Sequence, residues 1–194
     1  MYYIYDSINN YNDNDYKSFY NRLNNLDKIK IDKLINTSDK KLTILSRILL
    51  NKLLNKYYNT SYFDINIKYN KYNKPYIDNI CFNISHSNDY ACAVVSNKNV
   101  GIDIELIRNN TDIINYICTD KEINYINKSI NKYKSLFTIF CLKEAYFKMI
   151  GTGIDNLKDI EFTFNNKDII CNKGNFNIII DYSIDNYVIC IIEE

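Results

Sequence analysis

The sequence predicts an α+β fold with largely antiparallel sheets, because strand-like and helix-like segments occur in separate groups along its 194 residues. A strand and helices come first, a group of strands follows, then helices, and the last third returns to strands. Hydrophobic residues make up 46% of the chain and aromatic residues 14%, which excludes a disordered protein. A chain of this length forms one domain of ordinary size or two small fused halves.

The first third of the chain is predicted to contain one short strand and two helices. We expect the strand at residues 2–5 and a weak helix at 15–26. Leucine and isoleucine then recur every three or four positions from residue 39 to about 58, which indicates an amphipathic helix. Either Thr37 or Ser38 is suited to cap the first turn of this helix.

The middle of the chain is predicted to form short strands. Residues 63–67 alternate apolar and polar side chains, as a half-buried strand does, and Pro75 then interrupts the chain. Three apolar segments follow, and we expect residues 97–99 to form a hairpin loop between the last two of them. These segments are "ICFNIS", "YACAVVS" and "VGIDIEL".

Helices are predicted again after Arg108, and strands after the last of those helices. We expect helices at residues 111–118, 120–127 and 131–150, and Gly151 is a suitable residue to end the third. The strands of the last third are joined by Asn, Gly and Asp turns. They lie in "DIEFTF", "DIIC", "FNIIIDY" and "YVICII".

Charge and cysteine content exclude several classes of function. Lys and Arg (24) nearly balance Asp and Glu (23), so a net charge of +1 creates no field that would attract nucleic acid. The six cysteines lack CxxC spacing and one histidine is too few for a zinc site, so we expect buried thiols in a reducing compartment. The sequence has neither a leader-like start nor an apolar run of ~18 residues, and we therefore expect a cytoplasmic protein without a membrane span.

Two carboxylates stand close together in the segment "GIDIE". Asp103 and Glu105 are two residues apart on a predicted strand, so both point to one face of the sheet while Ile102 and Ile104 point to the other. Neighbouring carboxylates repel, and a shared cation relieves that repulsion. The same pattern also occurs on ordinary exposed strands, so it allows a metal site without requiring one.

A second group of charged residues lies on the long helix, in "FCLKEAYFKMIGTGI". Glu144 and Lys148 are four residues apart, which places them on one helical face in the favourable order for an ion pair. A surface ion pair is the simpler interpretation. Phe140 and Phe147 lie near the same stripe, however, which indicates a packed face. A third carboxylate from this helix would complete an oxygen site for Mg²⁺ with Asp103 and Glu105.

The only histidine lies between two serines at the end of a predicted strand. A lone histidine is most often a structural hydrogen-bonding residue. Yet His86 with Ser85 and Ser87, and Lys74 upstream, provide the donors that a site for several phosphates needs. No serine with a nucleophile elbow is present, so His86 is not interpreted as the base of a catalytic triad.

In this order and spacing, the segments "NKPYI", "FNISHSNDY", "VGIDIE" and "FCLKEAYFKMIGTGI" resemble the Sfp-type 4′-phosphopantetheinyl transferases, over roughly residues 74–154. The resemblance implies a pseudo-dimer of two similar α+β halves, residues 1–98 and 99–194, with the active site in the cleft between them. It also implies a monomer. The implied reaction moves the 4′-phosphopantetheine arm of coenzyme A to a serine of an apo acyl or peptidyl carrier protein and releases adenosine 3′,5′-bisphosphate.

The resemblance also implies a role for each matching residue. Lys148 corresponds to the lysine at the phosphates, and Glu144 would take the proton from the carrier serine, directly or through a metal-bound water. Ser85 and His86 correspond to contacts with the coenzyme A phosphates, and Lys74 with Pro75 to the adenine-side loop. The implied ligands of Mg²⁺, or of Mn²⁺ in its place, are Asp103, Glu105 and Glu144.

The sequence departs from the family at a few positions. Phe140 stands where the family usually has tryptophan, and Glu122 is a candidate match for an acidic residue before the long helix. The family's arginine for the coenzyme 3′-phosphate is replaced by Leu42 or Thr43, depending on the position of a gap. The candidate substitutes, among which the sequence does not choose, are Lys28, Lys30, Lys33, Lys40, Lys41 and Arg47.

Two other functions are compatible with the same residues. A metal-dependent phosphodiesterase would use a similar set of carboxylates. A non-catalytic coenzyme A-binding protein or scaffold of the same fold would explain the missing arginine.

Overall fold

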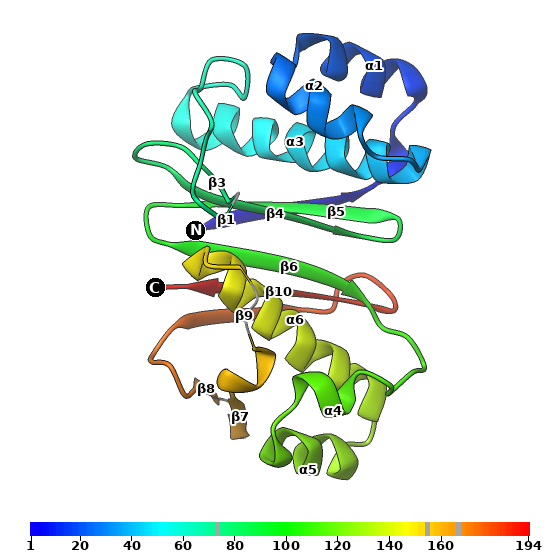
Figure 1. Ribbon diagram of the computed structural model, residues 1–194, viewed down its shortest axis with the longest axis vertical. Coiled ribbons are helices and arrows are strands. Elements are labelled where there is room, and N and C mark those ends of the chain that lie inside the picture. The colour runs from blue at the N-terminus through cyan, green and yellow to red at the C-terminus, as the bar shows by residue number, and fades with distance from the viewer. Residues whose placement is uncertain (73, 154–155, 166–167) are drawn as a thin grey trace. The chain divides into compact units, whose positions relative to one another are not determined.

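The computed structural model describes residues 1–72, 74–153, 156–165 and 168–194, and it confirms the α+β class (Figure 1). Contacts between residues divide the chain into two compact units, Met1–Asn97 and Lys98–Glu194. Each unit has its own antiparallel sheet and its own long helix.

The first unit contains a three-stranded sheet in the order β1-β5-β4, with both pairings antiparallel. Helix α3 packs on this sheet, because Leu45 and Leu49 on one stripe of the helix meet Ala91 and Ala93 of β5 in a buried core. In chain order the elements are β1 (Tyr2–Ser7), the 3-10 helix η1 (Ile8–Asn10), α1 (Asp13–Arg22), α2 (Asn25–Asp32), α3 (Thr37–Tyr58), β2 (Lys68–Tyr69), β3 (Pro75–Tyr76), β4 (Cys81–Ser87) and β5 (Tyr90–Ser96).

The second unit contains a three-stranded antiparallel sheet in the order β6-β10-β9. Helix α6 packs on it, and Cys141 and Ala145 of the helix share a buried core with Val188 and Cys190 of β10. In chain order the elements are β6 (Val100–Leu106), α4 (Ile114–Ile117), α5 (Asp120–Lys128), α6 (Lys132–Ile150), the 3-10 helix η2 (Leu157–Asp159), β7 (Phe162–Asn165), β8 (Asp168–Cys171), β9 (Asn177–Asp181) and β10 (Tyr187–Glu193).

The two units share one topology. In each, the first strand pairs with the last strand, which pairs in turn with the strand before it. In each, the long helix follows the first strand and precedes a two-stranded ribbon, β2-β3 in the first unit and β7-β8 in the second. The repetition lies in the order and pairing of elements, and no repeat is evident in the residues themselves.

Helix α6 lies unusually close to β6 at Gly101. A Cβ atom at this position would lie 1.9 Å from the backbone oxygen of Ala145 and 2.5 Å from the backbone nitrogen of Met149. Both atoms belong to the helix backbone, so no side chain can move aside to make room. The absence of a side chain at Gly101 therefore fixes how near α6 stands to the strand that carries Asp103.

Several turns use asparagine where a left-handed backbone is needed. Asn59 follows α3 with φ 50°, Asn88 lies in the β4–β5 hairpin with φ 52°, and Asn186 precedes β10 with φ 61°. Asparagine tolerates this conformation better than other residues with a side chain. At the end of α6 the predicted glycine cap is confirmed, since Gly151 has φ 70° and its N–H bonds to the Phe147 carbonyl at 2.8 Å.

Three of the expected helices have different limits. The weak helix expected at 15–26 is two helices, because Leu23 is extended and the Asn24 side chain accepts the N–H of Asp27 to start α2. The long helix begins at Thr37 with Asn36 as its N-cap, so the expected capping by Thr37 or Ser38 is wrong. Helix α4 is a single turn, shorter than expected.

Two expectations in the middle of the chain are also wrong. Residues 63–67 form no strand; a turn from Ser61 to Asp64 begins this segment, with the Asp64 N–H bonded to the Ser61 carbonyl. Phe63, Ile65 and Ile67 nevertheless pack against the core of the first unit, which explains their alternation. Residues 97–99 form no hairpin loop, because β5 and β6 belong to different sheets.

In the described parts of the chain, no helix combines the length and the apolar character needed to cross a bilayer. The six cysteines are free thiols, five of them buried, as expected.

Gly101→Ala tests the close approach of α6 to β6. We expect this substitution to lower the free energy of unfolding by about 1–3 kcal/mol or more, because overpacking against backbone forces the helix to move. Urea unfolding of the two chains measures the difference. Adding Ala145→Gly should give no rescue, since the clash involves the Ala145 carbonyl; recovery of wild-type stability in the double variant would show that the crowding involves side chains instead.

Candidate functional site

Strand β6 carries Asp103 on the face that α6 covers. Asp103 lies opposite Cys190 in the register of β6 and β10, and it is only 2% exposed. Burial raises the pKa of the Cys141 thiol on α6 well above its ordinary value, and the fields of Cys190, Asp103 and Glu105 raise it further. The two carboxylates of "GIDIE" thus both act on the same helix residue, as expected for side chains two apart on a strand.

Lys148 on α6 forms an ion pair with Asp103. Its Nζ lies 2.5 Å from Asp103 Oδ1, and the Lys148 side chain is 30% exposed while that of Asp103 is 3% exposed. The lysine therefore bridges a buried carboxylate and the surface of the unit. The sequence placed Lys148 beside Glu144 on one helical face, and the partner from β6 was not anticipated.

Glu144 lies one helical turn before Lys148 and is partly buried. Burial raises the pKa of its carboxyl, the nearby Asp103 raises it further, and Lys148 acts in the opposite direction. The structure thus brings Asp103, Glu144 and Lys148 together from β6 and α6. Two carboxylates that repel each other beside one ammonium form an arrangement typical of a binding or catalytic site.

The donors of this cluster suit a hard cation. Mg²⁺ is commonly held by one or two carboxylates, with substrate phosphates and water completing its shell, and Asp103 and Glu144 provide such a pair. No group of three or more His, Cys, Asp or Glu side chains is arranged to hold a metal among the described residues. The positive charge beside Asp103 is that of Lys148.

The other predicted residues lie in the first unit. Ser85 and His86 are near the end of β4, where Ser85 is 7% exposed and His86 points to the exposed side. Lys74 directly precedes β3, and the Asn70 side chain accepts its N–H at 2.9 Å. Pro75 begins β3 and pairs with Tyr69 of β2. The motif "FCLKEAYFKMIGTGI" ends at Ile154, which is outside the described residues.

Two candidates for the coenzyme 3′-phosphate are engaged in the first unit. Arg47 is 8% exposed and its guanidinium bonds to Asp27 at 3.1 Å, so it serves a buried network that Tyr62 also joins. Lys41 pairs with Asp13 at 2.7 Å on the surface. Leu42, at the position of the family's arginine, is a core residue with 3% exposure.

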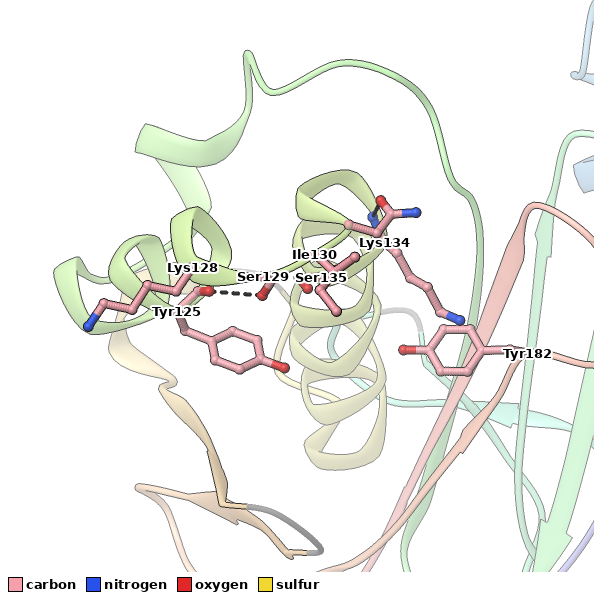
Figure 2. Close-up of a pocket in the computed structure, with 8 residues that line it drawn as sticks. Tyr125, Lys128, Ser129, Ile130, Lys134, Ser135 and Tyr182 are labelled. Atoms are coloured by element: carbon pink, nitrogen blue, oxygen red, sulfur yellow. Dashed lines mark hydrogen bonds between the residues drawn. The ribbon is translucent and has the colours of Figure 1, made fainter.

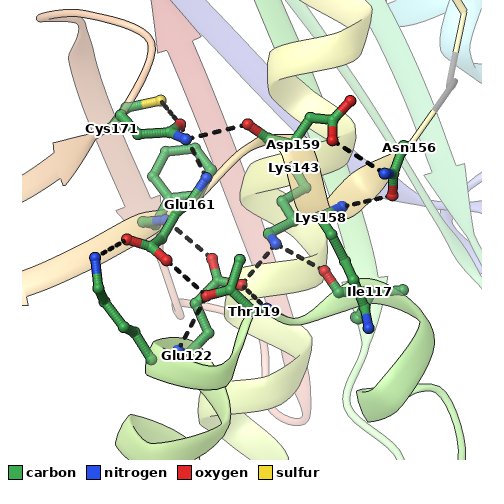
Figure 3. A network of polar contacts seen from close by, with 12 residues as sticks. Ile117, Thr119, Glu122, Lys143, Asn156, Lys158, Asp159, Glu161 and Cys171 are labelled. Atoms are coloured by element: carbon green, nitrogen blue, oxygen red, sulfur yellow. Dashed lines mark hydrogen bonds and ion pairs between the residues drawn. The ribbon is translucent and has the colours of Figure 1, made fainter.

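One buried residue of the long helix was not singled out from the sequence. Lys143 is fully buried, and its Nζ donates to Glu122 Oε2 at 2.6 Å and to the Ile117 carbonyl at 2.7 Å (Figure 3). The sequence contained a signal for it, because Lys143 falls on the buried stripe of α6 with Leu142 and Tyr146. Glu122, the candidate acidic residue before the helix, is its partner.

A separate hollow of about 480 Å³ lies between the end of α5, the start of α6 and Tyr182 (Figure 2). Lys134 lies 3.6 Å above the Tyr182 ring there. None of the residues predicted for the site lines this hollow; its lining is Tyr125, Lys128, Ser129, Ile130, Asn131, Lys134, Ser135 and Tyr182.

Two family models match the chain. Residues 99–192 match the 4′-phosphopantetheinyl transferase superfamily, and residues 10–98 match the N-terminal model described as 4′-phosphopantetheinyl transferase. The first match contains the whole cluster of Asp103, Glu144 and Lys148.

Curated relatives carry similar names. A 4′-phosphopantetheinyl transferase, gsp, of Aneurinibacillus migulanus is 32% identical over 124 residues, covering 62% of this chain and 52% of the relative. A putative 4′-phosphopantetheinyl transferase of Haemophilus influenzae is 34% identical over 96 residues, covering 45% and 41%. The chain thus spans about half the length of these relatives.

A solved holo-[acyl-carrier-protein] synthase from Thermotoga maritima is similar to part of the chain. The TM-score is 0.42 and the identity 24%, over 48% of this chain and 61% of the synthase.

The resemblance drawn from the four sequence segments is therefore confirmed by family models that together run from residue 10 to residue 192. The chain belongs to the 4′-phosphopantetheinyl transferase superfamily.

Proposed function

We propose that this protein transfers the 4′-phosphopantetheine arm of coenzyme A to a serine of an apo carrier protein and releases adenosine 3′,5′-bisphosphate. The observation that carries this proposal is the cluster of Asp103, Glu144 and Lys148, gathered by β6 and α6 within the segment that matches the superfamily. Transfer from a pyrophosphate requires a deprotonated nucleophile, charge neutralisation on the phosphate oxygens and an in-line leaving group. The cluster offers groups for the first two requirements.

Glu144 is proposed as the general base. A raised pKa makes a carboxylate a stronger proton acceptor, and both burial and Asp103 raise the pKa of Glu144. The serine Oγ of the carrier would lose its proton to Glu144 and attack the β-phosphorus of coenzyme A. The P–O bond to the α-phosphate side then breaks, and adenosine 3′,5′-bisphosphate leaves with that oxygen.

Asp103 and Glu144 are proposed to hold Mg²⁺, or Mn²⁺ in its place, and Glu105 would join them as a third ligand when the ion binds. When bound, the ion supplies positive charge that neutralises the pyrophosphate oxygens. Lys148, whose side chain is 30% exposed, is proposed to donate to the same phosphates. Its ion pair with Asp103 keeps the ammonium beside the carboxylates.

The N-terminal half, residues 1–98, is proposed to contribute contacts with coenzyme A. His86 and Ser85 would donate to its phosphates, and Lys74 with Pro75 would border the adenine. The exposed position of His86 supports a role in binding a ligand. We further propose that the enzyme is a monomer and that it is cytoplasmic. The six free cysteines support the cytoplasmic location, because thiols persist in a reducing compartment.

Substituting Glu144 tests the proposed base. Glu144→Gln should lower kcat about 10²–10⁴-fold, because the amide cannot accept the serine proton. Mass spectrometry of apo acyl and peptidyl carrier proteins, incubated with coenzyme A and magnesium, measures the transfer. Asp168→Asn, an exposed carboxylate on β8, is the matched control and should be fully active. Equal activity of the two variants would refute the assignment, and hydrolysis of coenzyme A without a carrier would identify a phosphodiesterase.

The raised pKa of Glu144 also predicts how stability depends on pH. A carboxyl whose pKa is higher in the folded state stabilises the fold below its unfolded pKa, of about 4.3, and this contribution is lost as pH rises through the folded pKa. The Glu144→Gln variant lacks this carboxyl, so it does not lose stability in this way as the pH rises. We therefore expect the Tm of the variant minus that of the wild type to increase from pH 4 to pH 7. A difference that stays constant or decreases would contradict the buried, repelled state of Glu144.

His86→Ala tests the proposed contact with coenzyme A. The substitution should raise the KM for coenzyme A about tenfold with a much smaller change in kcat, as expected when one hydrogen bond to a charged group is lost. Because His86 is exposed, the Tm of the variant should remain near that of the wild type. A lower Tm with an unchanged KM would show that the histidine is structural.

A further inference from the structure

We propose that Lys143 and Glu122 are positioning residues, whose buried ion pair sets the rotation of α6 so that Glu144 and Lys148 face Asp103. This inference deepens the proposed function, and its consequence for catalysis rests on that function. The positioning itself concerns only the second unit and can be tested without any reaction.

The pair is completely enclosed, and each of its charged groups has at least two hydrogen-bond partners. Lys143 is 0% exposed and Glu122 is 1% exposed. Glu122 Oε2 accepts from Lys143 Nζ at 2.6 Å and from the Thr119 N–H at 2.9 Å, while Oε1 accepts the Phe162 N–H at 2.9 Å (Figure 3). The ammonium also donates to the Ile117 carbonyl. One side chain of α6 is therefore tied to the turn before α5 and, through Glu122, to β7.

Stability alone does not account for such a pair. Removing two charges from water costs about as much as their attraction returns, and replacing a buried ion pair by apolar residues often leaves stability unchanged or raises it. An apolar contact tolerates small rotations of a helix, whereas hydrogen bonds of 2.6–2.7 Å to two fixed acceptors do not. The ion pair therefore adds a fixed direction for the Lys143 side chain, and with it a fixed rotation of α6.

The direction matters because Glu144 is the next residue. Successive side chains of a helix are about 100° apart, so fixing Lys143 toward α5 and Ile117 fixes the direction of Glu144 and, one turn later, of Lys148. A rotation of about 20° would move a carboxylate that lies about 6 Å from the helix axis by about 2 Å. Such a displacement is large compared with the 2.5 Å between Lys148 Nζ and Asp103 Oδ1.

Two independent constraints then place the helix. Gly101 sets its distance from β6, since a side chain there would strike the backbone of Ala145 and Met149. The Lys143–Glu122 pair sets its rotation about its own axis. Neither constraint replaces the other, because a helix held at the right distance can still turn.

A double-mutant cycle tests the positioning in the variant Glu122→Gln/Lys143→Met, which removes both charges together and leaves neither partner buried alone. Asp103→Asn, Lys148→Met and the two together are made both in the wild-type chain and in the Glu122/Lys143 variant. The free energies of urea unfolding then give the coupling energy between Asp103 and Lys148 in each of these two chains. We expect coupling in the wild type and its loss in the variant. If the variant does not fold, Glu122→Gln/Lys143→Leu, which also removes both charges and keeps an acceptor for Phe162, takes its place.

The matched control is Lys121→Met/Glu161→Gln. Lys121 and Glu161 form a neighbouring ion pair at 2.9 Å, but the Lys121 side chain is 79% exposed. This control changes the same charges near the same turn, so it should preserve the Asp103–Lys148 coupling. If the Glu122/Lys143 variant loses stability and keeps the coupling, the pair is merely structural and the proposal is wrong.

The catalytic consequence has its own measurement. In the Glu122/Lys143 variant, kcat for transfer to a carrier protein should fall about tenfold or more, as small misplacements of reacting groups cost large factors, while the KM for coenzyme A changes little. An unchanged kcat would overturn the catalytic part of the inference. If the wild-type chain transfers nothing to any carrier, the proposed function fails, and the coupling measurement still decides whether the pair positions α6.

Discussion

The contact between α6 and β6 is the constraint on which the candidate site depends. Asp103 comes from the strand, and Glu144 and Lys148 come from the helix, about 40 residues later in the chain. These groups meet because Gly101 lets the two backbones approach closely, so that Lys148 reaches Asp103 at 2.5 Å. The rest of the second unit, with α5, β7 and β10 packed around α6, supports this one contact.

The site places unfavourable charge in a poorly solvated environment. Asp103 is buried, Glu144 is partly buried beside it, and the pKa of Glu144 is raised as a result. A chain selected for stability alone would not keep two carboxylates so close, since each charge loses hydration and repels the other. Such a local conflict with the rules of folding is typical of a functional site, and the surrounding core compensates for it.

Much of the fold and the centre of the site could be predicted from the sequence, because both depend on short-range periodicity. The alternation of "GIDIE" and the four-residue spacing of Glu144 and Lys148 specify faces of a strand and of a helix. The partners across elements could not be predicted this way, since the pairing of Lys143 with Glu122 depends on tertiary packing. The strand predicted at residues 63–67 was wrong for a related reason. The alternation of these residues reflects contact with the core, whereas a strand also needs a hydrogen-bonding partner for its backbone.

The asparagines with positive φ have a consequence for how this fold tolerates change. The whole chain has only four glycines, and Asn59, Asn88 and Asn186 adopt backbone angles that glycine would meet without strain. Asparagine at these turns thus lets the amino-acid content of the chain change while its reversals of direction are kept. Glycine is then needed at Gly101, where two backbones nearly touch, and at Gly174, whose φ of 141° other residues rarely adopt, and divergence between distant relatives should be least at these points.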